Sequence, residues 1–245
     1  SRGLSLQDAR DYNIIGCVEP QKSGKTEGWH DAAFFNMCRP LELVFSNGID
    51  KGVRIGPATC NVEDMTTFEQ FYDAYKKQMD YAIQLLVNAD NAIDMAHAER
   101  CPLPFLSSMV DDCMKVGKTV QEGGAVYNFT GPQGFGVANM ADSLYSVKTL
   151  VYDEKKITMG ELKEALATNY GKGLGAEDVA AMTAKIANEL KEAGKTIGEK
   201  EVAAILNTVV AASEAPEVKA NGERILKLIE EVPKFGNDIP EVDAF

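Results

Sequence analysis

The chain has 245 residues, and 45% of them are apolar, so we expect one sizeable domain with its own hydrophobic core. Its formal net charge of −12 argues against a nucleic acid or an anionic membrane surface as the partner. Apolar runs are only a few residues long, which argues against a membrane-spanning helix and against the core of a signal peptide.

The cysteines are odd in number, and they are scattered without paired short spacings. Such a set argues against a disulfide framework and against a thiolate zinc site, so we expect no metal and a reducing compartment, the cytoplasm. The five are Cys17, Cys38, Cys60, Cys101 and Cys113.

The two ends suggest a piece of something larger. The chain begins at Ser1 rather than at Met, residues 2–10 read as the end of a helix, and Phe245 follows an acidic stretch. We therefore expect a fragment of a longer protein.

The first distinctive stretch reads Gly-Cys-Val-Glu-Pro after the apolar, partly β-branched residues 12–15, which predict a short strand. Gly16 permits backbone angles closed to other residues, and Pro20 restrains the residue before it. We expect a rigid loop that presents the Cys17 thiol and the Glu19 carboxylate to one small space, a reactive sulfur beside a group that exchanges protons. The alternative is a small buried hydrophobe, the usual role of a single cysteine in an apolar run.

Trp29, His30 and Asp31 precede residues 32–45, whose apolar side chains recur at helical spacing despite Pro40. The pattern predicts a helix with these three residues at its entrance. Asp31 is then either a helix N-cap or a substrate contact, and the residues alone leave both open.

Residues 65–100 predict a long helix with Thr66 or Thr67 as its cap. Asp94 and His97 share one face near its end, but no third metal ligand is evident, so a hydrogen-bonded pair is favoured. Apolar residues at spacings of three and four form one stripe, which predicts a buried helix: Phe68, Phe71, Tyr72, Tyr75, Met79, Ile83, Leu86 and Val87.

Residues 105–116 predict a further helix that ends at Gly117. The next stretch, 121–136, has too much glycine for regular structure and is too apolar for a solvated linker. We expect backbone packed tightly beside a site or another segment, lining or bracing the wall of the space that Cys17 and Glu19 face.

The rest of the chain reads as amphipathic helices. One is predicted over residues 137–152, and the others are rich in Ala, Lys and Glu, as in an ordinary surface bundle. Glycines separate these later helices, which are predicted over 161–170, 176–193, 199–213 and 216–231.

Four stretches together indicate one family. Gly16-Cys17-Val18-Glu19-Pro20-Gln21 resembles the cysteine loop of the glycyl radical enzymes, which include pyruvate formate-lyase. Residues 97–108 (His-Ala-Glu-Arg-Cys-Pro-Leu-Pro-Phe-Leu-Ser-Ser) and 123–134 (Gly-Gly-Ala-Val-Tyr-Asn-Phe-Thr-Gly-Pro-Gln-Gly) resemble its eliminases. Lys234-Phe235-Gly236-Asn237-Asp238 is similar to its Gly-Asn-Asp turn.

The resemblance implies a helix-rich α/β fold, the central part of a ten-stranded barrel with helices outside. Residues 1–170 would form the cysteine-loop part of the domain, residues 171–232 a helical insertion or outer helices, and residues 233–245 the return to the barrel.

It also implies a radical mechanism. A separate iron–sulfur activating enzyme that uses S-adenosylmethionine would place a radical on a glycine in an Arg-Val-x-Gly-Tyr-like motif, which this sequence lacks. No cofactor would be bound in this chain, and the chain by itself would be inactive. Cys17 would become a thiyl radical that abstracts hydrogen from a substrate carbon, and Glu19 would remove the hydroxyl proton. Val18 stands where pyruvate formate-lyase has a second cysteine, which disfavours acyl transfer.

The subclass rests on Gly28-Trp29-His30-Asp31, which resembles the diol dehydratases and makes His30 and Asp31 the candidate substrate-binding residues. The leading hypothesis is a B12-independent glycerol or propane-1,2-diol dehydratase. The alternative is an isethionate sulfite-lyase, with which residues 36–40 are compatible, and a third is an inert fragment that binds a partner. The implied partners are a small diol or hydroxy-sulfonate, the activating enzyme and a second copy in a homodimer.

Overall fold

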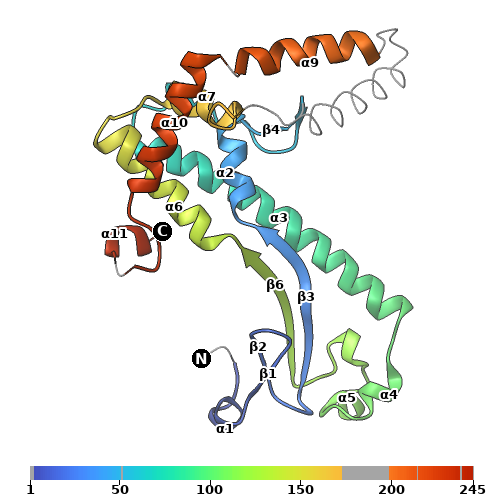
Figure 1. Ribbon diagram of the computed structural model, residues 1–245. Coiled ribbons are helices and arrows are strands. Elements are labelled where there is room, and N and C mark those ends of the chain that lie inside the picture. The colour runs from blue at the N-terminus through green and yellow to red at the C-terminus, as the bar shows by residue number, and fades with distance from the viewer. Residues whose placement is uncertain (1–2, 51, 173–198, 214, 238, 245) are drawn as a thin grey trace. The chain divides into compact units, whose positions relative to one another are not determined.

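The computed structural model describes residues 3–50, 52–172, 199–213, 215–237 and 239–244 (Figure 1). The helix predicted over residues 176–193 lies outside them. The chain divides into two compact units, each assembled from separate stretches. The first comprises Ser1–Leu43, Gly48–Ala58 and Tyr75–Val137, and the second comprises Val44–Asn47, Thr59–Ala74 and Ala138–Phe245.

The first unit begins with a short helix and a hairpin. Helix α1 (Leu6–Arg10) is capped by Ser5, whose side chain accepts a hydrogen bond from the Asp8 N–H. Strand β1 (Asn13–Ile15) pairs antiparallel with β2 (Glu19–Gln21), which confirms the short strand predicted before the cysteine loop.

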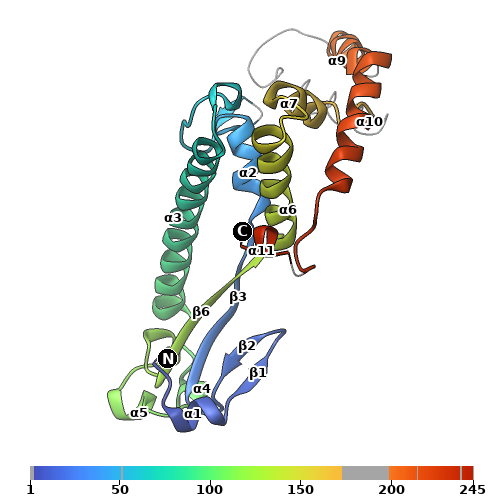
Figure 2. The ribbon, with the colours of Figure 1, turned by 90° about the vertical axis from the view of Figure 1, so that its left-hand side faces the viewer.

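The longest pairing of the first unit joins β3 (Thr26–Asn36) and β6 (Tyr127–Phe135), which run parallel, side by side (Figures 1 and 2). Two sequence predictions are therefore wrong: the start of the helix expected over 32–45 is strand, and the glycine-rich stretch contains a regular nine-residue strand. Each strand satisfies backbone hydrogen bonds along one edge of the other, and local sequence does not reveal such distant pairing.

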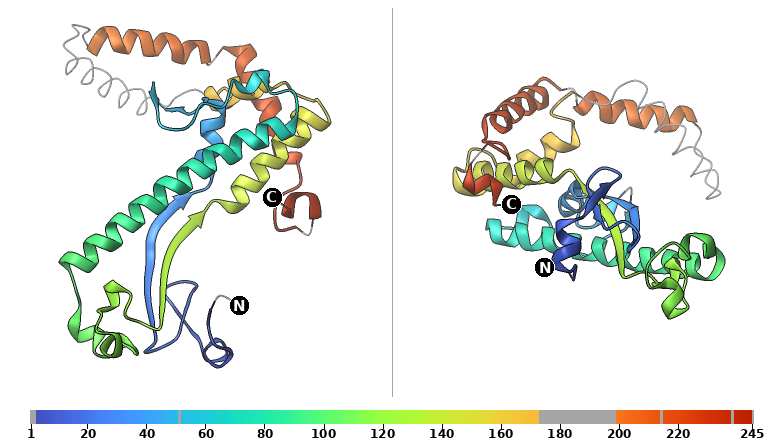
Figure 3. Two further views of the ribbon diagram at one scale, coloured as in Figure 1. Left: turned by 180° about the vertical axis from the view of Figure 1, so that it is seen from behind. Right: turned by 90° about the horizontal axis from the view of Figure 1, so that it is seen from below.

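The expected close packing of the glycine-rich stretch is confirmed only in part. A Cβ added at Gly124 would lie 2.3 Å from the carbonyl oxygen of Lys118, which leaves no room for a side chain. A Cβ added at Gly131 would lie 3.4 Å from the carbonyl oxygen of Trp29 on the neighbouring strand, which is an ordinary contact. Figure 3 shows the two strands from behind, where β6 follows β3 over most of its length.

Helix α2 (Cys38–Phe45) starts only after β3. Pro40 lies in its first turn, where a missing N–H costs no intrahelical bond. Two short strands, β4 (Ile49–Asp50) and β5 (Val53–Arg54), follow as an antiparallel pair. The described strands thus form three two-stranded sheets and no closed sheet, so this part of the chain has the expected helix-rich α/β character without closing a barrel.

The 3₁₀ helix η1 (Val62–Asp64) leads to α3 (Phe68–Arg100), the predicted long helix. The Thr67 hydroxyl oxygen accepts a hydrogen bond from the N–H of Gln70 at 3.3 Å, so Thr67 is the cap. The predicted apolar stripe is buried only near the start of the helix.

Phe71 and Tyr75 are 0% and 5% exposed, whereas Ile83 and Val87 are 43% and 44% exposed. The prediction of a helix buried along its whole stripe is wrong for the described residues, because none of their elements covers the later side chains.

The prediction of a single helix over residues 105–116 is also wrong. It is divided into α4 (Pro104–Ser107) and α5 (Cys113–Val116), which the non-helical residues 108–112 separate. The last of these, Asp112, takes a left-handed conformation with φ 73°. The helix does end at Gly117, as predicted, and the 3₁₀ helix η2 (Val120–Glu122) follows. Cys113 packs with Val120, Ala125 and Val110 in a small core.

Helix α6 (Val137–Val147) continues into the π-helical turn η3 (Lys148–Asp153), which confirms the helix predicted over 137–152. In the second unit, α7 (Met159–Ala167) and α9 (Glu199–Ser213) confirm two further predictions.

Helix α10 (Pro216–Glu231) has the predicted bounds, and α11 (Pro240–Asp243) follows it. Gly222 of α10 is buried against the end of the α7 segment, where an added Cβ would lie 2.3 Å from the carbonyl carbon of Tyr170. The described part of the predicted Gly-Asn-Asp turn is a turn, with Gly236 at φ 81°.

No helix in the described ranges is both long enough and apolar enough to cross a membrane.

Candidate active site

The turn between β1 and β2 presents Cys17, whose side chain is exposed in this chain, so it is not the buried hydrophobe of the alternative interpretation. Gly16 opens the turn at φ 61°, in the left-handed region that glycine adopts at little cost. A Cβ at this position would also lie 2.7 Å from Glu19 Oε2. Gly16 is therefore required both by the backbone angle and by the close approach of the glutamate.

The Glu19 side chain folds back under the turn and is buried, with 8% of its surface exposed. Its Oε2 accepts hydrogen bonds from the backbone N–H groups of Cys17, at 2.8 Å, and Val18, at 3.0 Å. Backbone hydrogen bonds, that from Val18 first, lower the pKa of the Glu19 carboxyl, and the nearby His30 adds to this effect. Glu19 is thus a charged acceptor held at the backbone N–H of Cys17.

Strand β3 carries the other two candidates. Its pairing with β6 is irregular between His30 and Phe34, and Asp31 lies in this irregularity with φ 57°. Asp31 is therefore not a helix N-cap, because the helix begins seven residues later, at Cys38. An exposed carboxylate in a bulged strand remains available to a ligand.

His30 is half-buried, and its ring nitrogen Nε2 is buried without a hydrogen-bond partner among the described residues. Gly28 lies two residues earlier on the same strand, and a Cβ there would lie 2.2 Å from this nitrogen. The glycine therefore makes room for the imidazole. Trp29, between them, makes an edge-on contact with His97, with ring centroids 5.0 Å apart.

The structure places His97 against an aromatic ring. Among the described residues no three His, Cys, Asp or Glu side chains gather as a metal site would require.

Gln133 of β6 links two of the candidates, Glu19 and Asp31, and the sequence analysis did not single it out. Its Nε2 donates a hydrogen bond to Glu19 Oε1 at 2.8 Å and another to Asp31 Oδ1. One amide thus connects the hairpin to the bulged strand. The only signal in the sequence is a polar residue between a proline and a glycine within the stretch predicted to brace the site.

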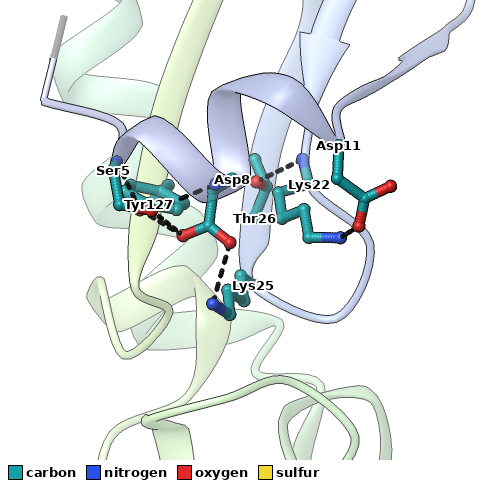
Figure 4. A network of polar contacts seen from close by, with 7 residues as sticks. All are labelled: Ser5, Asp8, Asp11, Lys22, Lys25, Thr26 and Tyr127. Atoms are coloured by element: carbon teal, nitrogen blue, oxygen red, sulfur yellow. Dashed lines mark hydrogen bonds and ion pairs between the residues drawn. The ribbon is translucent and has the colours of Figure 1, made fainter.

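A second polar network fastens the elements that carry the site, and Figure 4 shows it. Asp8 of α1 accepts hydrogen bonds from Tyr127 Oη at 2.7 Å, Ser5 Oγ at 2.8 Å and Lys25 Nζ at 2.9 Å. These contacts, that with Lys25 first, lower the pKa of Asp8 to about 2. Lys25 directly precedes β3 and Tyr127 begins β6, so the network connects α1 to the N-terminal ends of both strands.

The outer part of this network belongs to the loop before β3. Lys22 Nζ forms an ion pair with Asp11 at 2.5 Å, and its backbone N–H donates to Thr26 Oγ1 at 2.9 Å (Figure 4). The loop is thereby held at both of its ends, next to the hairpin that carries Cys17.

A family model described as pyruvate formate lyase-like matches residues 1–245. A solved structure on 1,2-propanediol dehydration in Roseburia inulinivorans is 58% identical, with a TM-score of 0.89, over 99% of this chain and 29% of that chain. The glycerol-bound form of the B12-independent glycerol dehydratase from Clostridium butyricum is 48% identical, with a TM-score of 0.77, over 99% of this chain and 25% of that one.

Among curated proteins, the (2S)-3-sulfopropanediol dehydratase of Klebsiella oxytoca is 39% identical over 171 residues, which are 69% of this chain and 21% of the relative. The chain thus spans about a fifth of the length of such curated relatives.

Proposed function

Since the chain belongs to the pyruvate formate lyase-like family, we propose that it serves in a glycyl radical lyase, a B12-independent dehydratase of glycerol or propane-1,2-diol. The observation that carries the proposal is the arrangement around Cys17. The exposed thiol lies in a turn whose backbone holds Glu19, and Gln133 joins Glu19 to Asp31.

The catalytic roles follow from these residues. A glycyl radical, installed by an iron–sulfur enzyme that uses S-adenosylmethionine, supplies the unpaired electron that lets the Cys17 sulfur take a hydrogen atom. Cys17 then forms an S–H bond as a C–H bond of the diol breaks, and Glu19 accepts the proton of the hydroxyl on that carbon. The neighbouring C–O bond breaks, and its hydroxyl leaves with that proton as water. Cys17 returns the hydrogen atom to carbon, so the net change is diol to aldehyde plus water.

The substrate class follows from charge. Two carboxylates accept hydrogen bonds and donate none, so Glu19 and Asp31 suit two neutral hydroxyls. A sulfonate would be repelled by Asp31 and would need arginines. Arg39 is already paired with Glu42 and Asp50, at 2.7 Å each, so it offers no support for an anionic substrate.

The wider setting belongs to the same proposal. The partners would be the activating enzyme and a second copy in a homodimer, in the cytoplasm, and His30 would contact the substrate beside Asp31. The chain would be divided into residues 1–170 and 233–245 in a ten-stranded barrel and residues 171–232 as an insertion or outer helices. A diol that carries a sulfo group is the competing substrate, because the Klebsiella oxytoca relative is named for one.

The test is Asp31→Ala in the full-length enzyme, assayed for aldehyde from glycerol and propane-1,2-diol and for sulfite from isethionate. We expect the wild type to form aldehyde and Asp31→Ala to lose roughly 10- to 100-fold in kcat/KM, because one hydrogen bond to a charged group is lost. Asp153→Ala is the control, because Asp153 is 50% exposed in a surface ion pair with Lys148. Sulfite release by a wild type that ignores both diols would show that the dehydratase proposal is wrong.

A further inference from the structure

One neutral side chain lies between two carboxylates in the candidate site. Gln133 Nε2 donates to Glu19 Oε1 at 2.8 Å and to Asp31 Oδ1. The other oxygen of Glu19 already accepts hydrogen bonds from two backbone N–H groups. Of these hydrogen bonds, only the two from Gln133 fix the Glu19 and Asp31 carboxylates relative to each other.

The chemistry of the amide suits this position. An –NH₂ group carries two hydrogens, one for each carboxylate oxygen, whereas the amide oxygen has none to offer. The two acceptors therefore require the –NH₂ end of Gln133 to face them. A neutral donor also leaves both carboxylates with their full charge, whereas a lysine or arginine here would neutralise one of them.

The backbone explains how Gln133 reaches both groups. It lies on β6 opposite Phe34, directly after the irregularity that contains Asp31, and Pro132 and Gly134 flank it. The parallel pairing of β3 and β6 thus sets where the amide lies along the strand, within hydrogen-bonding reach of both carboxylates.

We propose that Gln133 is a positioning residue that determines substrate specificity, because its amide holds Glu19 and Asp31 at the separation of two hydroxyls on adjacent carbons. The inference rests on the proposed dehydratase function. It extends that function by naming the residue that matches the two acceptors to a vicinal diol.

Two variants of similar size separate this role from a merely structural one in the full-length enzyme. Gln133→Met removes the donor, so the carboxylates repel and one takes up a proton more readily. We expect kcat/KM to fall roughly 10- to 100-fold, since a hydrogen bond to a charged group is lost, and the acid limb of the pH profile to move to higher pH. Gln133→Glu regains one O–H donor only when protonated, so its activity should rise as the pH falls.

Gln7→Met, on the exposed face of α1, is the matched control and should keep the wild-type profile. Opposite pH responses in the two Gln133 variants would support the proposal. A wild-type kcat/KM and acid limb in Gln133→Met would overturn it, as would an equal loss in both variants without a pH effect.

The choice of substrate distinguishes a failure of the Gln133 proposal from a failure of the proposed dehydratase function. A wild type that dehydrates neither diol refutes the proposed function, and the same variants are then measured on the substrate that it does convert. A crystal structure of the unactivated Gln133→Met protein needs no activity. We expect the Glu19 and Asp31 carboxylates to change their separation, and carboxylates that keep their wild-type positions would overturn the positioning role.

Discussion

Replacing Glu19 by glutamine tests the centre of the site with almost no change in size. The carboxylate accepts three hydrogen bonds: Oε2 takes those from Cys17 and Val18, and Oε1 takes that from Gln133. A glutamine side chain has only one accepting oxygen. If this oxygen faces the two backbone N–H groups, its –NH₂ group meets the –NH₂ group of Gln133, and one of the three bonds is lost.

We expect a large loss of rate and little change in the structure of the turn. The turn keeps its two backbone hydrogen bonds, so Cys17 should stay where it is, but the proton acceptor beside it is gone. Removal of a positioned general base typically lowers kcat by about 10²- to 10⁴-fold. We therefore expect Glu19→Gln to lose kcat within this range while the glycyl radical forms as in the wild type.

The assay is aldehyde formation by the activated full-length enzyme, normalised to the radical content measured by EPR. Glu122→Gln is the matched control: the Glu122 carboxylate also accepts from a backbone N–H, that of Thr119 at 2.9 Å, but in a capping box that tolerates glutamine. The control should keep wild-type turnover. If Glu19→Gln kept more than about a tenth of kcat at equal radical content, the general-base role would be refuted.

Three further predictions concern the thiol, the anchoring network and the second unit. Cys17→Ser should abolish turnover and leave the glycyl radical intact, because the hydrogen of a hydroxyl is far harder to abstract; surviving turnover would contradict the assignment. The pKa of Asp8 is lowered to about 2, so its network stabilises the fold above about pH 4 and weakens as the pH falls toward 2. Asp8→Asn should remove this acid sensitivity in pH-dependent hydrogen exchange, and Asp11→Asn should not. Equal profiles in the two variants would disprove the role of Asp8. Gly222→Ala should cost about 3 kcal/mol through the backbone overlap, or about 2 kcal/mol after the gain in helix propensity, in chemical unfolding of the full-length protein. Gly160→Ala, whose added Cβ has its nearest contact at 4.0 Å, should be neutral or stabilising; equal effects would refute the packing argument.

The sequence by itself determined the features that depend on neighbours along the chain. Helix α10 has the predicted bounds because its apolar period and the proline at its first turn are local signals. The cysteine-loop motif is equally local: Gly16 and Glu19 are only three residues apart, and their close approach follows from that spacing. Its resemblance to the family was sufficient to indicate the family that the comparisons show.

Only the tertiary structure decided which distant residues share the site. Residues 32–36 and 127–135 form strands because they pair with each other, about a hundred residues apart along the chain, against the helical spacing of the first and the glycine content of the second. That pairing moved Asp31 from an expected helix entrance to an irregularity in a strand, and it brought Gln133 to both carboxylates. A backbone hydrogen bond between strands has no local sequence signature, so the residue that joins the two acceptors became visible only once the strands were in register.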